Sequence, residues 1–69
     1  MPTLIKISSD GEPVDIEGTH PEALRRILDV LRSLKSLAKI NDRTEDFIRF
    51  SYAFDITIRE LERRGEEPT

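Results

Sequence analysis

The segment TLIKISSDGEPVDIE, residues 3–17, decides the fold class, because its apolar residues alternate with polar ones as they do in strands. Asp10-Gly11 is typical of a two-residue hairpin turn, since glycine and, less readily, aspartate accept the positive φ that such a turn requires. Counting outward from this turn, the predicted cross-strand pairs are Ile7–Val14 and Ile5–Ile16 on one face and Lys6–Asp15 on the other. In this register one face carries apolar pairs and the other an opposite-charge pair, so the segment predicts a β-hairpin over about residues 3–17.

The hairpin is followed by a predicted helix over about residues 20–40. Gly18 ends the second strand, and Thr19 with Glu22 three residues later has the spacing of a capping box. Pro21 suits the first turn of a helix, where its missing N–H has no intrahelical partner to lose. The apolar residues of this segment recur every three or four positions and comprise Ala23, Leu24, Ile27, Leu28, Leu31, Leu34 and Ala38. This spacing predicts a helix with one buried face.

A second helix is predicted over about residues 43–64. Asn41 tolerates the left-handed conformation that ends a helix, and Asp42 with Glu45 repeats the capping-box spacing. Gly65 is suited to the position just after the second helix, and residues 65–69 form a tail. The chain therefore predicts a single α+β domain over residues 1–69, a two-layer ββαα fold in which the N-terminal hairpin packs on an antiparallel helix pair.

The second helix carries more large apolar residues than one buried face can hold. A first stripe, stepping by three or four, consists of Phe47, Phe50, Phe54, Ile58 and Leu61. A second stripe, stepping by four on roughly the opposite side, consists of Ile48, Tyr52 and Ile56. We expect the first stripe to be nearly inaccessible in the core, together with Ile5, Ile7, Val14, Ile16, Leu24, Ile27, Leu28, Leu31 and Leu34.

A comparison of lengths predicts that the hairpin covers only part of the helix pair. A strand of this length spans about 17–20 Å, whereas a helix of twenty residues spans about 30 Å. The helix ends that meet at the loop should therefore extend beyond the hairpin. These ends carry Leu37, Ile40, Phe47 and Ile48, with Phe50 at the border.

The second stripe allows two interpretations. Its residues are either boundary residues, half covered by the hairpin or by arginine stems, or an association surface. Tyrosine and arginine are enriched at interface hot spots, and an i, i+4, i+8 row is how a helix presents anchors to a groove. We favour the association surface, with each of its three apolar residues substantially exposed. The predicted protein-binding residues are Ile48, Tyr52, Ile56, Arg49, Asp55, Arg59 and Ile40.

Composition argues against several other classes of function. The 69 residues include 14 acidic and 11 basic side chains, for a net charge of -3, and no basic face that would suit nucleic acid is visible. Arg59, Arg63 and Arg64 alternate with glutamates and are interpreted as a solvated helix end. There is no apolar run of about 18 residues for a membrane span and no signal peptide, so the default expectation is a cytosolic protein.

Residues with catalytic or metal-binding chemistry are sparse. The chain has no cysteine and a single histidine, His20, so no disulfide and no thiol or imidazole cluster for a transition metal is expected. Asp15 and Glu17 share one face of a strand, where two neighbouring carboxylates are usually solvated. The serines lack the context of a nucleophile elbow. We therefore expect no enzyme, no cofactor and no small-molecule substrate.

From Thr3 to Gly65 the chain resembles computationally designed mini-proteins, which combine an Asp-Gly hairpin, capping boxes, a short helix–helix loop and a terminal glycine. Designed binders also keep an exposed apolar patch on a rigid helix. The resemblance implies a protein-binding mini-protein that presents Ile48, Tyr52 and Ile56 to a protein partner. The alternative is a fold-only design or a small natural structural domain that forms a homodimer through the same stripe.

Overall fold

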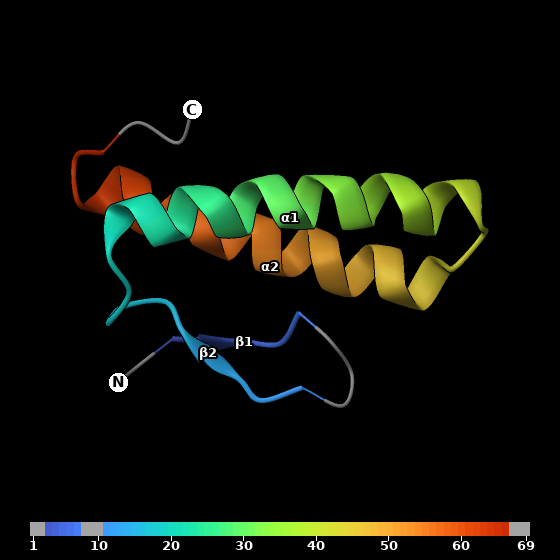
Figure 1. Cartoon of the computed structure of the whole chain (residues 1–69), viewed down its shortest axis with the longest axis horizontal. Coiled ribbons are helices and arrows are strands. Elements are labelled where there is room, and N and C mark those ends of the chain that lie inside the picture. Colours follow the sequence, from blue (N-terminus) through green and yellow to red (C-terminus); the bar gives the residue numbers. More distant parts are fainter. Residues whose placement is uncertain (1–2, 8–10, 67–69) are drawn as a thin grey trace.

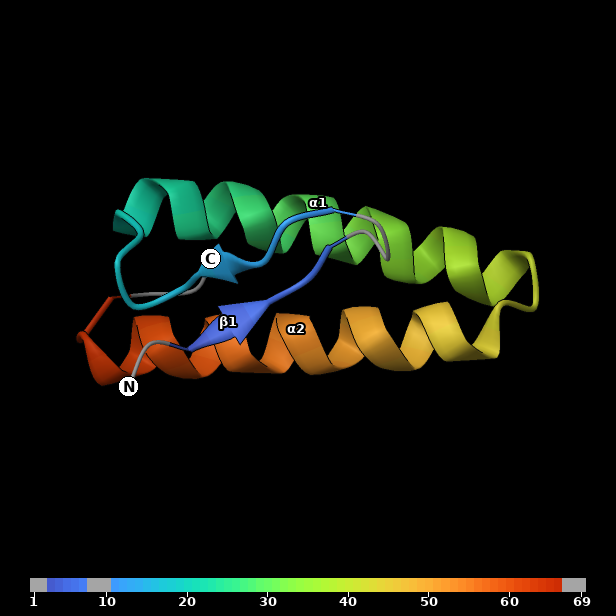
Figure 2. The same cartoon turned by 90° about the horizontal axis from the view of Figure 1, so that it is seen from below.

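A computed structural model describes residues 3–7 and 11–66 of the chain. The elements follow in the order β1 (Leu4–Ile5), β2 (Val14–Asp15), α1 (Pro21–Ile40) and α2 (Thr44–Arg63). The two helices run antiparallel and side by side, and the two-stranded antiparallel hairpin lies across one face of the pair (Figures 1 and 2). The predicted ββαα layout is confirmed, and both helices agree with their predicted bounds to within one residue at each end.

The register of the hairpin differs from the prediction by two residues. Ile5 pairs with Val14, and Leu4 pairs with Asp15, so all three predicted pairs, Ile7–Val14, Ile5–Ile16 and Lys6–Asp15, are wrong. A shift of two residues keeps every side chain on the same face of the ribbon, because side chains alternate with a period of two. The hydrophobic pattern therefore cannot distinguish these two registers. Asp10 of the predicted turn lies outside the described residues.

The start of α1 is capped by His20 rather than by Thr19. The Nδ1 atom of His20 accepts a hydrogen bond from the backbone N–H of Glu22 at 3.1 Å. The Thr19 hydroxyl instead donates to the backbone carbonyl of Asp15, which tightens the turn between β2 and α1. The predicted Thr19–Glu22 capping box is therefore wrong, because the preceding turn already uses the threonine hydroxyl.

The loop between the helices also differs from the prediction in detail. Asp42, with a φ of 54°, is the left-handed residue, whereas Asn41 has a φ of −94°. The N–H of Arg43 donates to the carbonyl of Ala38 at 2.8 Å, which is the Schellman pattern that satisfies the end of a helix. Since Asp42 terminates α1, it does not cap α2. Arg43 takes the N-cap position of α2 without a side-chain hydrogen bond to the described residues, so the predicted Asp42–Glu45 box is wrong.

The end of α2 is as predicted. Gly65 has a φ of 76°, and its N–H donates to the carbonyl of Glu62 at 3.0 Å. The N–H of Glu66 donates to the carbonyl of Leu61 at 2.9 Å, which completes a second Schellman motif. Both helices therefore end in a fixed geometry, which helps to make the helix pair a rigid scaffold.

The core lies between the two helices and the inner face of the hairpin. Its buried apolar residues are Ile5, Ile16, Leu24, Leu28, Leu31, Ala38, Phe50, Ala53 and Leu61. Seven further residues predicted for the core are only partly buried at its margin, namely Ile7, Val14, Ile27, Leu34, Phe47, Phe54 and Ile58.

The buried face of α2 is rotated from its predicted position. It centres on the small residues Ala53 and Thr57, which are 2% and 0% exposed, while Phe47 and Phe54 lie to one side. Phe50 remains buried in this face, whereas Phe47 and Phe54 are only partly buried at its margin. The Thr57 hydroxyl donates to the carbonyl of Ala53 at 2.8 Å, so its burial leaves no unpaired hydroxyl.

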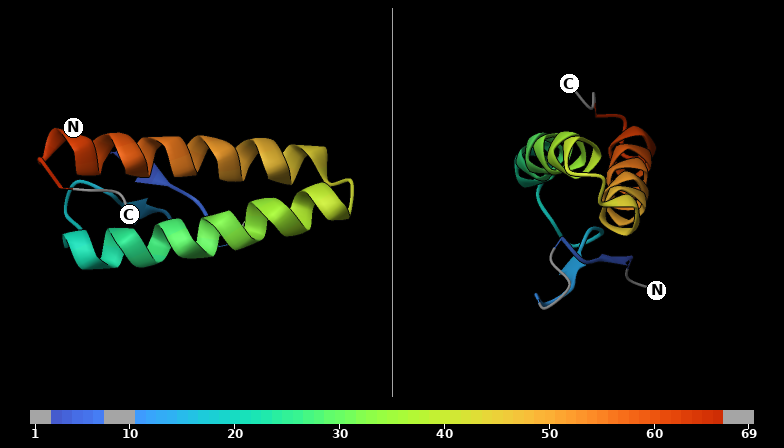
Figure 3. Two further views of the ribbon diagram at one scale, coloured as in Figure 1. Left: turned by 90° about the horizontal axis from the view of Figure 1, so that it is seen from above. Right: turned by 90° about the vertical axis from the view of Figure 1, so that its right-hand side faces the viewer.

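The hairpin covers only part of the helix pair, as the lengths of the elements predict. The strands lie beneath the end of the pair where α1 begins and α2 finishes, and the end near the helix–helix loop extends beyond them (Figure 1). Leu37 and Ile40 near this loop are 55% and 77% exposed. Phe50 is nevertheless buried in the core, and the guanidinium carbon of Arg49 lies 5.1 Å from the centroid of its ring. No described helix or strand covers the opposite face of the helix pair (Figure 3).

Candidate protein-binding surface

The exposed apolar residues of α2 lie on the side of the helix opposite its buried stripe. Ile48 and Tyr52 are one turn apart and 62% and 66% exposed, as predicted. Asp55 and Arg59 are also exposed and follow at i+7 and i+11 from Ile48, so helical geometry places them on the same side. These four residues, Ile48, Tyr52, Asp55 and Arg59, form what we call the outward face of α2.

Ile56 does not belong fully to this face. Its side chain is partly buried against the hydrophobic core, so the expectation that all three stripe residues stay largely exposed is wrong for Ile56. It lines a hollow of 280 Å³ together with Thr3 of the hairpin and Arg59 of α2. Ile56 lies at the edge of α2 that faces the hairpin, and the chain beside β1 covers part of it.

Arg49 closes the core rather than flanking the stripe. One of its Nη atoms lies 3.2 Å from the Asp46 carboxylate, and its guanidinium lies over the ring of Phe50. Its side chain is 33% exposed, and its Nε is buried without a hydrogen-bond partner among the described residues. A partner that docks on the outward face of α2 would meet Arg49 only at the margin.

Ile40 lies on the other helix. It is the last residue of α1 and is nine positions after the buried Leu31, which places it on the opposite side of that helix. The exposed sides of α1 and α2 each point away from the contact between the helices. The structure therefore does not bring Ile40 next to Tyr52, and the two belong to different surfaces.

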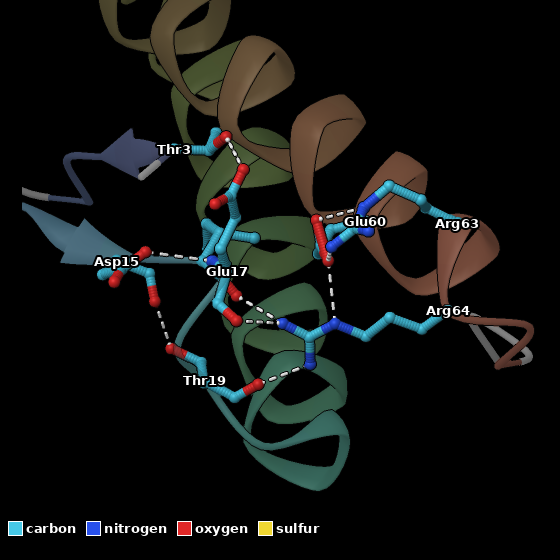
Figure 4. Close-up of polar contacts among 8 residues, drawn as sticks. Thr3, Asp15, Glu17, Thr19, Glu60, Arg63 and Arg64 are labelled. Carbon is cyan, nitrogen blue, oxygen red and sulfur yellow. Dashed lines mark hydrogen bonds and ion pairs between the residues drawn. The ribbon is translucent and has the colours of Figure 1, made fainter. Parts of the chain in front are cut away.

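A partly buried ionic network at the end of α2 was missed by the sequence analysis (Figure 4). The Glu60 carboxylate is only 7% exposed and accepts hydrogen bonds from Arg63 at 2.6 and 3.0 Å and from Arg64 at 2.8 Å. The Arg64 guanidinium also donates to three backbone carbonyls, those of Thr19 at 2.6 Å, Ile16 at 3.0 Å and Glu17 at 2.6 Å. Arg64 thereby ties the end of α2 to the segment that joins β2 to α1, so its interpretation as part of a solvated helix end is wrong.

The charge on Glu60 is stabilised by its arginine partners. Hydrogen bonds from Arg63 lower the pKa of the Glu60 carboxyl, burial opposes them, and Arg64 acts in the same direction as Arg63. The same hydrogen bonds raise the pKa of Arg63. A carboxylate held ionised in this way is suited to anchoring the two arginines. Its position three residues after Thr57 and one before Leu61, with arginines at i+3 and i+4, is the sequence signal that could have revealed it.

Asp15 ends β2 and Glu17 lies in the turn that follows, so the two carboxylates do not share a strand as predicted, and each has a local role in the hairpin. The Asp15 carboxylate accepts a hydrogen bond from the backbone N–H of Glu17 at 3.0 Å, and the Glu17 carboxylate accepts one from the Thr3 hydroxyl at 3.2 Å (Figure 4).

Within residues 3–7 and 11–66, no group of three or more acidic, histidine or cysteine side chains could hold a metal ion. Neither of the two described helices is long and apolar enough to cross a bilayer.

The chain matches no protein-family model, no curated protein and no solved structure.

Proposed function

We propose that the chain is a protein-binding module that docks the outward face of α2 on a partner protein, without a catalytic role. The observation that carries this proposal is the exposure of Ile48 and Tyr52, two large side chains one turn apart on a regular helix. Tyrosine combines a large apolar surface with a hydroxyl that can bond across an interface, which explains its enrichment at interface hot spots. The resemblance to designed binders supports the same function.

The scaffold around these two residues suits such a role. Both ends of α2 are held, by the Schellman turn at Asp42 and by the contacts of Arg64 with the hairpin side. A face that is already ordered loses little conformational entropy when it binds. Asp55 and Arg59 form no ion pair with any described residue, so their charges are available to a partner.

Self-association is a second candidate, and the order of residues about Tyr52 favours it. If two copies of α2 packed antiparallel with Tyr52 on the two-fold axis, residues equally far from Tyr52 would meet. Ile48 would then lie near Ile56 of the partner subunit, and Glu45 near Arg59 of the partner subunit. Both contacts are complementary, one apolar and one between opposite charges.

The proposal is tested with the double variant Ile48→Gln/Tyr52→Gln. The matched control is Val30→Gln/Leu37→Gln, which removes two α1 side chains of similar exposure, 49% and 55%. Because all four residues are exposed, the free energy of unfolding of each double variant should lie within about 1 kcal/mol of that of the unchanged chain. In a screen against a protein panel, the α2 variant should lose the binding that the control retains.

Light scattering on the isolated chain separates the two candidates. A monomer at all concentrations favours a different protein as the partner, whereas a dimer that Tyr52→Glu dissociates favours self-association. Equal loss of binding in the α1 control, or unfolding of the α2 variant, would show that Ile48 and Tyr52 are not the binding residues.

A further inference from the structure

A second surface lies on the face of the helix pair that the hairpin leaves open. There α1 and α2 border a groove of 320 Å³, which we call the Phe47–Phe54 groove, lined by Arg32, Lys35, Ser36, Lys39, Phe47 and Phe54. On α2 these phenylalanines flank the buried stripe on the side opposite Ile56, the residue at the hairpin edge. Figure 3 shows this open face in its left view, with the hairpin behind the helices.

The groove combines an aromatic floor with a cationic wall. The Nζ atom of Lys35 lies 4.7 Å from the ring centroid of Phe54 and 5.8 Å from that of Phe47, and the guanidinium carbon of Arg32 lies 5.9 Å from that of Phe54. Three of the six described lining residues are cationic and none is acidic, although the whole chain has a net charge of -3. None of the three cations forms an ion pair with a described residue. The groove therefore has positive charge that is not neutralised locally.

The two walls share one spacing. Arg32 and Lys39 are seven residues apart on α1, and Phe47 and Phe54 are seven apart on α2. Seven residues of a helix span about 10.5 Å, or two turns. A third helix laid in the groove would match both walls if it carried apolar residues two turns apart and carboxylates beside them.

We propose that the Phe47–Phe54 groove binds an acidic amphipathic helix of a partner protein. Carboxylates on that helix pair with Arg32, Lys35 and Lys39, and its apolar residues cover the exposed edges of the two phenylalanine rings. The site is separate from the outward face of α2 and does not depend on it.

Charge and shape select this occupant over others. No described element covers the groove from outside, so a small molecule would keep much of its surface in water, whereas ligand sites usually enclose their ligand. Single-stranded nucleic acid also favours cationic grooves, but it stacks its bases on free aromatic faces. Here the cations of Lys35 and Arg32 already lie over the rings. An acidic amphipathic helix meets both requirements of the groove, because its carboxylates can pair with the cations and its apolar side can cover the exposed ring edges.

The test uses a phage-displayed library of helical peptides of about 18 residues, five turns, selected on the full chain. The selected peptides should be acidic, with apolar residues seven positions apart. Binding of the best peptide, measured by fluorescence anisotropy, should weaken about tenfold or more with Lys35→Glu and should also weaken with added salt. The control Arg26→Glu makes the same charge change on an exposed part of α1 away from the groove and should leave affinity unchanged, as should Tyr52→Glu.

Lys35 is partly buried, so Lys39→Glu, at an exposed position on the same wall, repeats the test if Lys35→Glu does not fold. Several results would overturn the proposal. These are selection of neutral or basic peptides, no selected peptide at all, equal weakening by Arg26→Glu, or loss of binding with Tyr52→Glu. Tighter binding of a labelled oligothymidine than of any acidic peptide would assign the groove to nucleic acid instead.

Discussion

Arg64 is the residue whose removal tests most directly how the three parts of the fold are held together. Its guanidinium bonds to the Glu60 carboxylate and to the carbonyls of Ile16, Glu17 and Thr19, and its side chain is 20% exposed. Arg64→Ala removes all four bonds at once. The variant therefore lacks the three hydrogen bonds by which this side chain joins the end of α2 to the segment between β2 and α1.

The expected loss follows from these contacts. A hydrogen bond to a charged group contributes about 1.5–3 kcal/mol when it is well buried. At a side chain that is 20% exposed, water can replace part of what the three carbonyls lose, so we expect Arg64→Ala to lower the free energy of unfolding by about 2–4 kcal/mol in total. A core of this size supplies only about 3–5 kcal/mol, so the variant should be close to unfolding.

The measurement is urea unfolding followed by circular dichroism, with the melting temperature as a second readout. A loss of this size should lower the melting temperature by about 10 °C or more. The control is Arg63→Ala, since Arg63 bonds to the same Glu60 but is 66% exposed and makes none of the three carbonyl contacts. Arg63→Ala should lower the free energy of unfolding much less than Arg64→Ala does. If Arg63→Ala destabilised the chain as much as Arg64→Ala, the carbonyl contacts would contribute nothing, and an unchanged Arg64→Ala variant would refute the reasoning.

Three further predictions can be checked by the same unfolding assay. Since arginine hydrogen bonds lower the folded-state pKa of Glu60, its contribution to stability is present above its ordinary pKa of about 4.3 and is lost as the pH falls through the lower folded value. Glu60→Gln should flatten this acid-side decline, and an unchanged decline would contradict the assignment. Phe50→Ala should lower the free energy of unfolding by about 3–5 kcal/mol and Phe54→Ala by only about 1–2 kcal/mol, because Phe54 is partly exposed. A larger loss for Phe54→Ala than for Phe50→Ala would show that Phe54 belongs to the buried core. Asp42→Gly should stabilise the chain by about 0.5–1 kcal/mol, because glycine adopts a φ of 54° without strain, whereas Asn41→Gly should not stabilise it.

The parts of the structure that were predicted correctly depend on neighbours in the chain. Helix bounds follow from apolar spacing over a few turns, and the stop after α2 follows from Gly65, whose φ of 76° suits glycine. The exposure of Ile48 and Tyr52 could also be anticipated, because one helix cannot bury residues on opposite sides against a single layer.

The errors in the prediction have a common physical origin, since each concerns a choice between local patterns that fit the chain equally well. The hairpin register shifts by two residues without moving any side chain to the other face, so the alternation of apolar and polar residues cannot select Ile5–Val14 pairing. The rotation of α2 is set by its packing against the rest of the chain rather than by its own spacing, and it places Ala53 and Thr57 at the centre instead of Phe54.

Local sequence alone determined the order and type of the elements, the bounds of both helices and the presence of surplus apolar surface on α2, whereas the two strands, Leu4–Ile5 and Val14–Asp15, are shorter than predicted. The tertiary structure decided which charges have partners and where they lie. Arg64 meets the carbonyl of Ile16, 48 residues away, and Lys35 of α1 lies over the rings of Phe47 and Phe54 on α2. Spacing along one helix sets which of its side chains share a face. The residues that this face meets depend on packing among all the elements together, because side chains distant in sequence must fit the same space.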